Sequence, residues 1–220
     1  GMVGFMLKLD HGHSVVEVAE NYSRLDETLW PQLVESLGRL DILQAGFLNP
    51  SYRIEPTQVR RILDYARRNY KITCVDLSGN MEKYSIEALH EATRIFLVVT
   101  PEIPSLHLAR EKLSFLRGID VETSVSILVN RAQKHNAVPL EEIERLLGLQ
   151  VAGMFANDYH GVHRALTAGT TVPPDTELGK SFDQFAKVLL EKKPLERSHK
   201  RRFVEYFSLL PARYLAPGSK

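Results

Sequence analysis

The sequence predicts an α/β protein with a mostly parallel sheet that helices cover on both faces. Short apolar runs rich in β-branched residues recur along the chain, and amphipathic segments of helix length separate them. These runs are apolar nearly throughout, which is typical of strands buried on both faces of a parallel sheet. The two observations together predict one α/β domain over residues 1–190, followed by a separate tail over residues 191–220.

Composition narrows the class of protein. The chain has 220 residues, of which 44% are hydrophobic and 25% charged, and this is ample material for one large core. A formal net charge of +1 gives no overall attraction to nucleic acid. The single cysteine excludes an internal disulfide framework, and no run of about 18 apolar residues is present to span a membrane. We therefore expect a globular protein of the cytoplasm.

The first third of the chain gives the weakest pattern of helices and strands. Residues 3–9 fit a strand or a short helix, and Ser14 is placed to cap a helix that starts at Val15. Leucines at four-residue spacing predict a helix over residues 25–37, ending near Gly38. A short strand over residues 40–46 and a helix over residues 57–68 follow.

The stretch over residues 70–80 is the one around which the chain is organised. Its apolar run closes on Asp76 and breaks at Ser-Gly-Asn, which predicts a buried strand that delivers a carboxylate to a loop. A carboxylate there is able to hold the water shell of a nucleotide-bound magnesium ion, as a Walker B aspartate does. The alternative is that Asp76 is an ordinary strand end.

The rest of the chain alternates regularly between the two kinds of segment. The strand over residues 94–100 is stopped by Pro101 and Pro104. Further strands are predicted over residues 124–130 and 150–155, and helices over residues 84–92, 105–116, 140–147, 160–168 and 181–190.

Four segments, in this order, carry a family resemblance. They are Cys-Val-Asp-Leu-Ser-Gly at residues 74–79, the strand and Thr-Pro turn at 95–101 with the helix start at 104–110, Ile-Leu-Val-Asn-Arg at 127–131, and Asn-Asp-Tyr at 157–159. The set resembles the MinD/ParA group of deviant Walker ATPases, and most closely its pilus-assembly members CpaE and TadZ. The resemblance runs from about residue 9 to residue 190.

The resemblance implies a P-loop NTPase-like fold that binds ATP and magnesium, and it assigns a role to several residues. No catalytic residue is assigned. The phosphate side would be formed by the Walker B strand end, with Asp76 reaching magnesium through water, and the base pocket by two later strand ends. The residues so assigned are Asp76, Ser78, Gly79, Asn130, Arg131, Asn157 and Asp158.

One family motif does not occur in the 220 residues. They contain no Gly-x-x-x-x-Gly-Lys-Ser/Thr and no lysine-rich variant of it, so no phosphate cradle is assigned. In relatives the strand before that motif lies beside the Walker B strand, and its loss would expose two strand edges. Residues 3–9, a neighbouring chain, or further sequence of a longer protein would have to fill the gap. Ala156 also replaces the proline of the family's base-pocket loop.

The tail over residues 191–220 is basic and then apolar. If it is helical, its apolar side chains fall on one face just after a basic cluster; these residues are Lys200, Arg201, Arg202, Phe203, Phe207 and Leu210. Such a segment is able to contact an anionic membrane, a second copy, a partner's groove or the chain's own domain.

Three hypotheses for function follow. The first is a CpaE/TadZ-like factor that positions or assembles a pilus. It would be a homodimer with pilus-assembly or secretion proteins as partners, and it would be a pseudo-ATPase if ATP binding is lost. The second is an active ATPase whose P-loop lies outside these residues. The third, a ParA-like DNA-partitioning protein, requires a basic face, for which the helix over residues 57–68 offers Arg60, Arg61, Arg67 and Arg68, and the tail over residues 191–220 offers further basic residues. Nucleic acid is the least expected partner.

Overall fold

The computed structural model describes residues 2–9, 12–46, 53–133 and 137–190. The chain divides into two compact units: unit 1 comprises residues 1–95 and 158–176, and unit 2 comprises residues 96–157 and 177–220. The tail over residues 191–220, with the six residues named above, lies outside the described residues. No helix of the described part is both long and apolar enough to cross a membrane.

Unit 2 is built on a three-stranded sheet in the order β3 (Ile95–Val99), β4 (Val125–Ala132) and β5 (Val151–Ala156). Strands β4 and β5 are parallel, with Ile127 opposite Val151 and Ala132 opposite Ala156. A parallel pair needs a crossover, and α7 (Leu140–Leu147) provides it. All three strands were predicted within about two residues of their observed ends.

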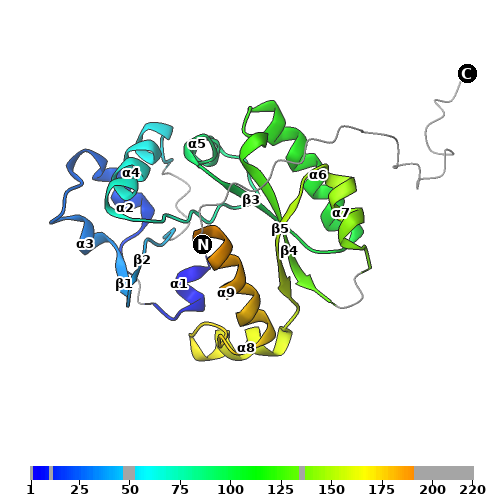
Figure 1. The fold of residues 1–220 in the computed structure, drawn as a ribbon. Coiled ribbons are helices and arrows are strands. Elements are labelled where there is room, and N and C mark those ends of the chain that lie inside the picture. The colour runs from blue at the N-terminus through cyan, green and yellow to red at the C-terminus, as the bar shows by residue number, and fades with distance from the viewer. Residues whose placement is uncertain (1, 10–11, 47–52, 134–136, 191–220) are drawn as a thin grey trace, which may run out of the picture. The chain divides into compact units, whose positions relative to one another are not determined.

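Helices cover both faces of this sheet (Figure 1). On one face lie α7 and α6 (Ile103–Gly118), whose apolar sides pack into the most deeply buried part of the unit. On the other lies α9 (Glu177–Leu190), whose Phe185 contacts the rings of Phe96 on β3 and Phe155 on β5 at centroid distances of 5.3 and 5.5 Å. The buried core includes Leu113, Leu116, Ile127, Val129 and Ile143. The predicted fold class is confirmed.

Unit 1 contains helices and one small hairpin. Its helices are α1 (Val3–Met6), α2 (Val15–Glu20), α3 (Trp30–Leu33), α4 (Pro56–Asn69), α5 (Lys83–Glu91) and α8 (Tyr159–Ala168), with a 3-10 turn at Tyr22–Arg24. A buried cluster of Val18, Ala19, Trp30, Leu33 and Ile62 joins α2, α3 and α4. Ser14 and Glu17 form the predicted cap at the start of α2, where Ser14 N–H donates to Glu17 Oε2 at 2.6 Å.

The prediction of one helix over residues 25–37 is wrong. The Asp26 carboxylate accepts hydrogen bonds from the backbone N–H groups of Thr28 and Leu29, at 2.9 and 2.7 Å, and only the four residues of α3 follow as helix. The chain then enters an antiparallel hairpin of β1 (Glu35–Leu37) and β2 (Leu40–Ile42). Gly38 turns it with a φ of +65°, a conformation that glycine adopts without strain.

The segment at residues 3–9 forms the short helix α1 and not a strand. Residues 3–9 therefore do not form the strand that would fill the gap left by the absent P-loop strand beside the Asp76 segment.

Candidate functional site

The segment that carries Asp76 is not a strand. Residues 72–78 belong to no helix, strand or turn, and Asp76 is exposed. Ile72 and Val75 are 59% and 50% exposed, and residues 71–76 make no backbone hydrogen bond to another described residue. The prediction of a buried strand failed because a strand requires a partner ladder, and the described residues supply none beside this segment.

Asp76, Ser78 and Gly79 all lie on this connection between α4 and α5. After them α5 begins, with Glu82 at its N-cap position and no side-chain capping hydrogen bond. Burial, together with a hydrogen bond to Glu82, raises the pKa of the Tyr84 hydroxyl in the first turn. The loop therefore carries a carboxylate, a hydroxyl and a glycine within four residues, and a second carboxylate, that of Glu82, follows three residues after Gly79.

Ion pairs hold together the two helices that flank this connection. Arg60 on α4 reaches Glu87 on α5 at 2.6 Å, and Arg67 reaches Glu91 at 3.0 Å. Arg67 also pairs with Asp64 at 3.1 Å. Two of the four arginines that the DNA hypothesis required are thus already neutralised by carboxylates, which leaves less positive charge for a phosphate backbone.

Asn130 and Arg131 lie at the end of β4, in unit 2. The Arg131 N–H donates to Asn130 Oδ1 at 2.9 Å, and Arg131 has a φ of +56°, which is uncommon for a residue with a side chain. The Asn157 N–H donates to the Ala132 carbonyl at 2.9 Å and joins the end of β5 to the end of β4. These three predicted site residues are therefore brought together at the carboxyl ends of two parallel strands, where α/β proteins bind ligands.

Asp158 has a structural role in the described residues. Its Oδ1 accepts a hydrogen bond from the Gly161 N–H at 2.7 Å and caps α8. A Cβ at Gly161 would lie 2.0 Å from Asp158 Oδ2, so glycine is what allows this close approach. Asp158 and α8 belong to unit 1, whereas Asn157 belongs to unit 2.

The described residues do not form a complete ATP and magnesium site. They contain no group of three His, Cys, Asp or Glu side chains placed to hold a metal ion. The helix that starts after Asp76 carries Glu82 at its N-cap, and a carboxylate there opposes a phosphate group. What is present is one carboxylate loop and one pair of strand ends, without a phosphate cradle.

No protein-family model matches the chain. Among curated proteins it is similar to the putative septum site-determining protein MinD of Emiliania huxleyi, with 24% identity over 102 residues, and to that of Mesostigma viride, with 24% identity over 190 residues. The matches cover 44% and 82% of this chain but only 37% and 65% of those relatives. The chain thus spans less than two thirds of the length of these curated relatives.

Solved structures give a closer agreement in fold. A ParA family ATPase from Chlorobium tepidum superposes with a TM-score of 0.73 at 22% identity, covering 80% of this chain and 76% of that one. MinD in a MinC:MinD cell division complex from Aquifex aeolicus gives 0.71 at 20% identity, covering 88% and 81%. MinD from Pyrococcus horikoshii, complexed with Mg-ADP, gives 0.68 at 13% identity, covering 84% and 77%. The chain therefore has the α/β fold of the MinD and ParA P-loop ATPase structures, and its sequence is similar to MinD proteins.

Proposed function

We propose that this protein is a MinD/ParA-type positioning or assembly factor of the CpaE/TadZ kind, which acts on a pilus-assembly machine in the bacterial cytoplasm. The four motif segments, the fold and the similarity to MinD proteins support the family. The observation that carries the functional choice is the Asp76 loop, which is exposed, lies outside any strand and is followed by an acidic N-cap. A scaffold that works without its own phosphate cradle fits this geometry best.

A second candidate rests on the same segment. Residues 71–76 are rich in β-branched and apolar side chains, yet they are exposed and their backbone is unpaired within the described residues. Such a segment is suited to pair with a strand from sequence beyond these 220 residues. If that strand also carried a P-loop, the protein would be an ATPase in which Asp76 orients magnesium-bound water.

A nucleotide titration separates the two candidates. The 220-residue chain is titrated with a fluorescent ATP analogue, with and without magnesium, beside Asp76→Ala and the control Asp175→Ala, which removes an exposed aspartate of unit 1. The scaffold predicts no saturable binding in any sample. Magnesium-dependent binding that Asp76→Ala abolishes and Asp175→Ala retains would contradict the scaffold and favour the ATPase.

A genetic experiment tests the pilus role separately. In a host that carries the gene, its deletion should abolish assembled pili or misplace them. A copy with Asp76→Ala should restore them if the protein is a scaffold, and should fail to do so if it hydrolyses ATP. Normal pili in the deletion strain would refute the pilus assignment under either candidate.

The remaining parts of the proposal concern assembly and location. We place the protein in the cytoplasm as a homodimer, with the basic tail over residues 191–220 contacting the inner membrane or a partner of the pilus machine. MinD is found with MinC in the Aquifex aeolicus complex, which is a precedent for partner binding by a protein of this fold. Removing residues 191–220 should release the protein from vesicles that contain anionic lipid if the membrane is the contact.

A further inference from the structure

The described part of unit 2 leaves an apolar face partly open to solvent. The rings of Phe155 and Phe182 lie 4.5 Å apart, so Phe182 is on the side of α9 that faces the sheet, yet it is 51% exposed. Val98 follows Phe96 by two residues on β3 and therefore projects from the same face of the sheet, and it is 58% exposed. Phe96 in turn contacts Phe185, which lies one helical turn from Phe182. We call the surface formed by Phe96, Val98, Phe182 and Phe185 the α9 face.

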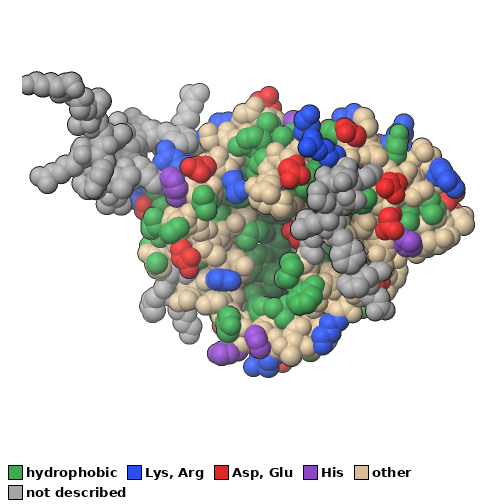
Figure 2. Space-filling view, turned by 180° about the vertical axis from the view of Figure 1, so that it is seen from behind, with side chains coloured by type: hydrophobic (Ala, Val, Ile, Leu, Met, Phe, Trp, Pro, Cys, Tyr) green, Lys and Arg blue, Asp and Glu red, His purple; other side chains and the backbone are tan. Residues whose placement is uncertain are grey.

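The α9 face offers apolar surface and no net charge. Val188, three residues after Phe185 and so on the same side of α9, is 40% exposed. Asp183 pairs with Lys187 at 2.6 Å. The charged residues of α9 are two of each sign, namely Glu177, Lys180, Asp183 and Lys187. Figure 2 shows that hydrophobic side chains gather in places on the surface, between charged side chains of both signs. Because an exposed group of apolar side chains is typical of an interaction site, a ligand of the α9 face would be held by apolar burial.

The tail that follows α9 in the sequence contains a segment of matching chemistry. Residues 203–210 include Phe203, Phe207 and Leu210, whose spacing places them on one face of a helix. The only charged residue of this segment is Glu205, which follows Phe203 by two residues and so falls on the opposite side of such a helix. The basic cluster of the tail ends before Phe203. A helix over residues 203–210 can therefore be buried on one side without burying a charge.

The connection between α9 and this segment is long enough to bring the two together. Residues 191–202 span about 40 Å when extended, at roughly 3.3 Å per residue. Phe182 lies only about 12 Å along α9 from Leu190, the last residue of the helix, at about 1.5 Å per residue. A short flexible linker also holds its end near the face at a local concentration in roughly the mM range. A separate protein needs a comparable concentration to compete, which favours the chain's own tail as the occupant.

We propose that residues 203–210 dock as a helix on the α9 face of the same chain, where Phe203, Phe207 and Leu210 cover Phe182 and Val98. Docking hides the apolar side chains that the tail offers to a membrane or a partner. A tail that contacts either of them must therefore first leave the α9 face. This consequence rests on the proposed function of the tail, whereas the docking itself requires neither nucleotide nor a pilus.

Disulfide formation tests the docking on the 220-residue chain. Cys74→Ser first removes the only cysteine, which is exposed. Val98→Cys is then combined with Phe207→Cys, and oxidation should join the two within one chain, which stays a monomer on a non-reducing gel. The control combines Phe207→Cys with Leu108→Cys, because Leu108 is 55% exposed on α6, which covers the other face of the sheet. We expect the first pair to form its disulfide at least about tenfold faster, because docking raises the local concentration of the two thiols.

Variants of the tail test the apolar contact without changing the folded units. The dye ANS binds exposed apolar surface, so replacing both phenylalanines, by Phe203→Ser and Phe207→Ser, should raise its fluorescence at least about twofold as the α9 face is uncovered. The matched control combines Lys200→Ser with Arg201→Ser, which removes two neighbouring charges and should leave the fluorescence unchanged. In the chain that carries Val98→Cys and Phe207→Cys, Phe203→Ser should slow disulfide formation at least about fivefold, because it weakens the docking.

Three outcomes would overturn the proposal. Equal rates for the two cysteine pairs would show that the tail has no preference for the α9 face. A disulfide that joins two chains, with none formed inside one chain, would assign the face to a second copy. ANS fluorescence that stays the same or falls when Phe203 and Phe207 are replaced would mean that the face is open in the original chain and takes another occupant, such as a partner or sequence beyond these 220 residues. None of these measurements uses nucleotide, vesicles or pili, so their failure is distinguishable from a failure of the proposed function.

Discussion

A single hydroxyl, that of Tyr70, holds the only tryptophan of the chain in its cluster. Trp30 is 7% exposed, and its Nε1–H donates to Tyr70 Oη at 2.6 Å. The same hydroxyl donates to Asp41 Oδ2 at 2.6 Å, and Ser36 also donates to Asp41. We predict that Tyr70→Phe destabilises unit 1 because the indole N–H then loses its partner inside the cluster.

The size of this effect follows from burial. A buried donor that is left unsatisfied costs about 1–3 kcal/mol. The Asp41 carboxylate is exposed and regains water, so its lost hydrogen bond adds little. We therefore expect the free energy of unfolding to fall by about 2 kcal/mol, which corresponds to a drop of roughly 4–8 °C in Tm for a chain of 220 residues. Urea unfolding followed by Trp30 fluorescence measures it directly.

Tyr65→Phe is the matched control. Tyr65 packs its ring against Trp30 at a centroid distance of 4.8 Å, and its hydroxyl makes no hydrogen bond to the described residues. This control should change the free energy of unfolding by less than about 0.5 kcal/mol. Equal and small effects of the two substitutions would refute the importance of the Tyr70 hydroxyl.

The hydrogen bonds also predict a pH dependence. The hydrogen bond that Ser36 donates to the Asp41 carboxylate, and to a smaller degree the one that Tyr70 donates, hold the pKa of Asp41 below its ordinary value of 3.8. A carboxyl with a lowered folded pKa stabilises the fold above its unfolded pKa, and this stability is lost as pH falls through the folded value. In Tyr70→Phe the acid-induced loss below about pH 4 should be smaller than in the original chain.

Two further predictions concern the helices. Leu116→Ala should destabilise unit 2 by about 2–5 kcal/mol, because it leaves a cavity under α6. Leu108→Ala on the same helix removes a side chain that is 55% exposed and should cost less than about 0.5 kcal/mol. Calorimetry compares the two variants, and equal costs would contradict the assignment of Leu116 to the core. Glu17→Ala should destabilise the fold by about 1 kcal/mol, because it removes the hydrogen bond from the Ser14 N–H that caps α2. Glu20→Ala, at an exposed position of α2, is the control, and unfolding of both variants is followed by Trp30 fluorescence. An equal loss of stability in the two variants would mean that the cap is unimportant.

The second half of the chain was predictable because its signals are local. Continuous apolar runs marked β3, β4 and β5, and α7 ends at Gly148 as predicted, whereas α6 extends two residues beyond each predicted end and α9 begins at Glu177, four residues earlier than predicted. The predictions failed where structure depends on distant or subtle partners. The leucine spacing over residues 25–37 was overridden by the Asp26 cap and the hairpin turn at Gly38.

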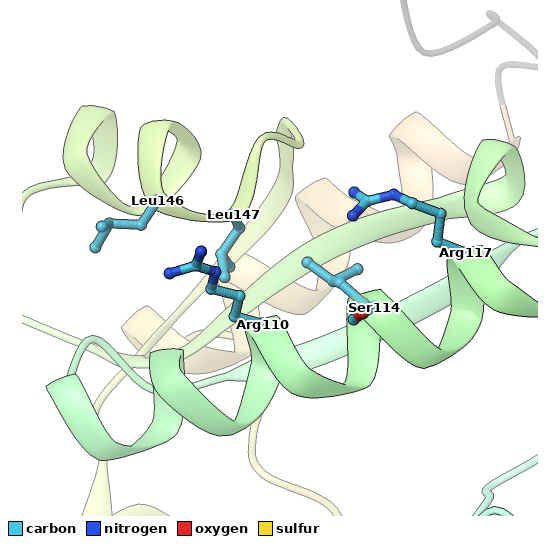
Figure 3. Close-up of a pocket in the computed structure, with 6 residues that line it drawn as sticks. Arg110, Ser114, Arg117, Leu146 and Leu147 are labelled. Atoms are coloured by element: carbon cyan, nitrogen blue, oxygen red, sulfur yellow. The ribbon is translucent and has the colours of Figure 1, made fainter. Parts of the chain in front are cut away.

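The candidate site was predictable in part for the same reason. Strand ends at Asn130 and Asn157 follow from the strands themselves, and the structure brings them together through Ala132. The left-handed φ of Arg131 and the ion pairs of Arg60 and Arg67 with α5 have no signature in the sequence. A small pocket lined by Arg110, Leu113 and Leu147 forms only because α7 packs against α6 (Figure 3), so no motif in the sequence indicates it.

Strand β3 has a practical consequence for anyone who concentrates this protein. It is one of the two outer strands of the described three-stranded sheet, its five residues are Ile-Phe-Leu-Val-Val, and Val98 is 58% exposed. Natural sheets usually guard such an edge with a lysine, a proline or a bulge, and this strand has no lysine or proline within it. Its uncharged edge is thus a place where strand-to-strand self-association is expected in a concentrated sample, and a charged residue in place of Val98 should reduce that association.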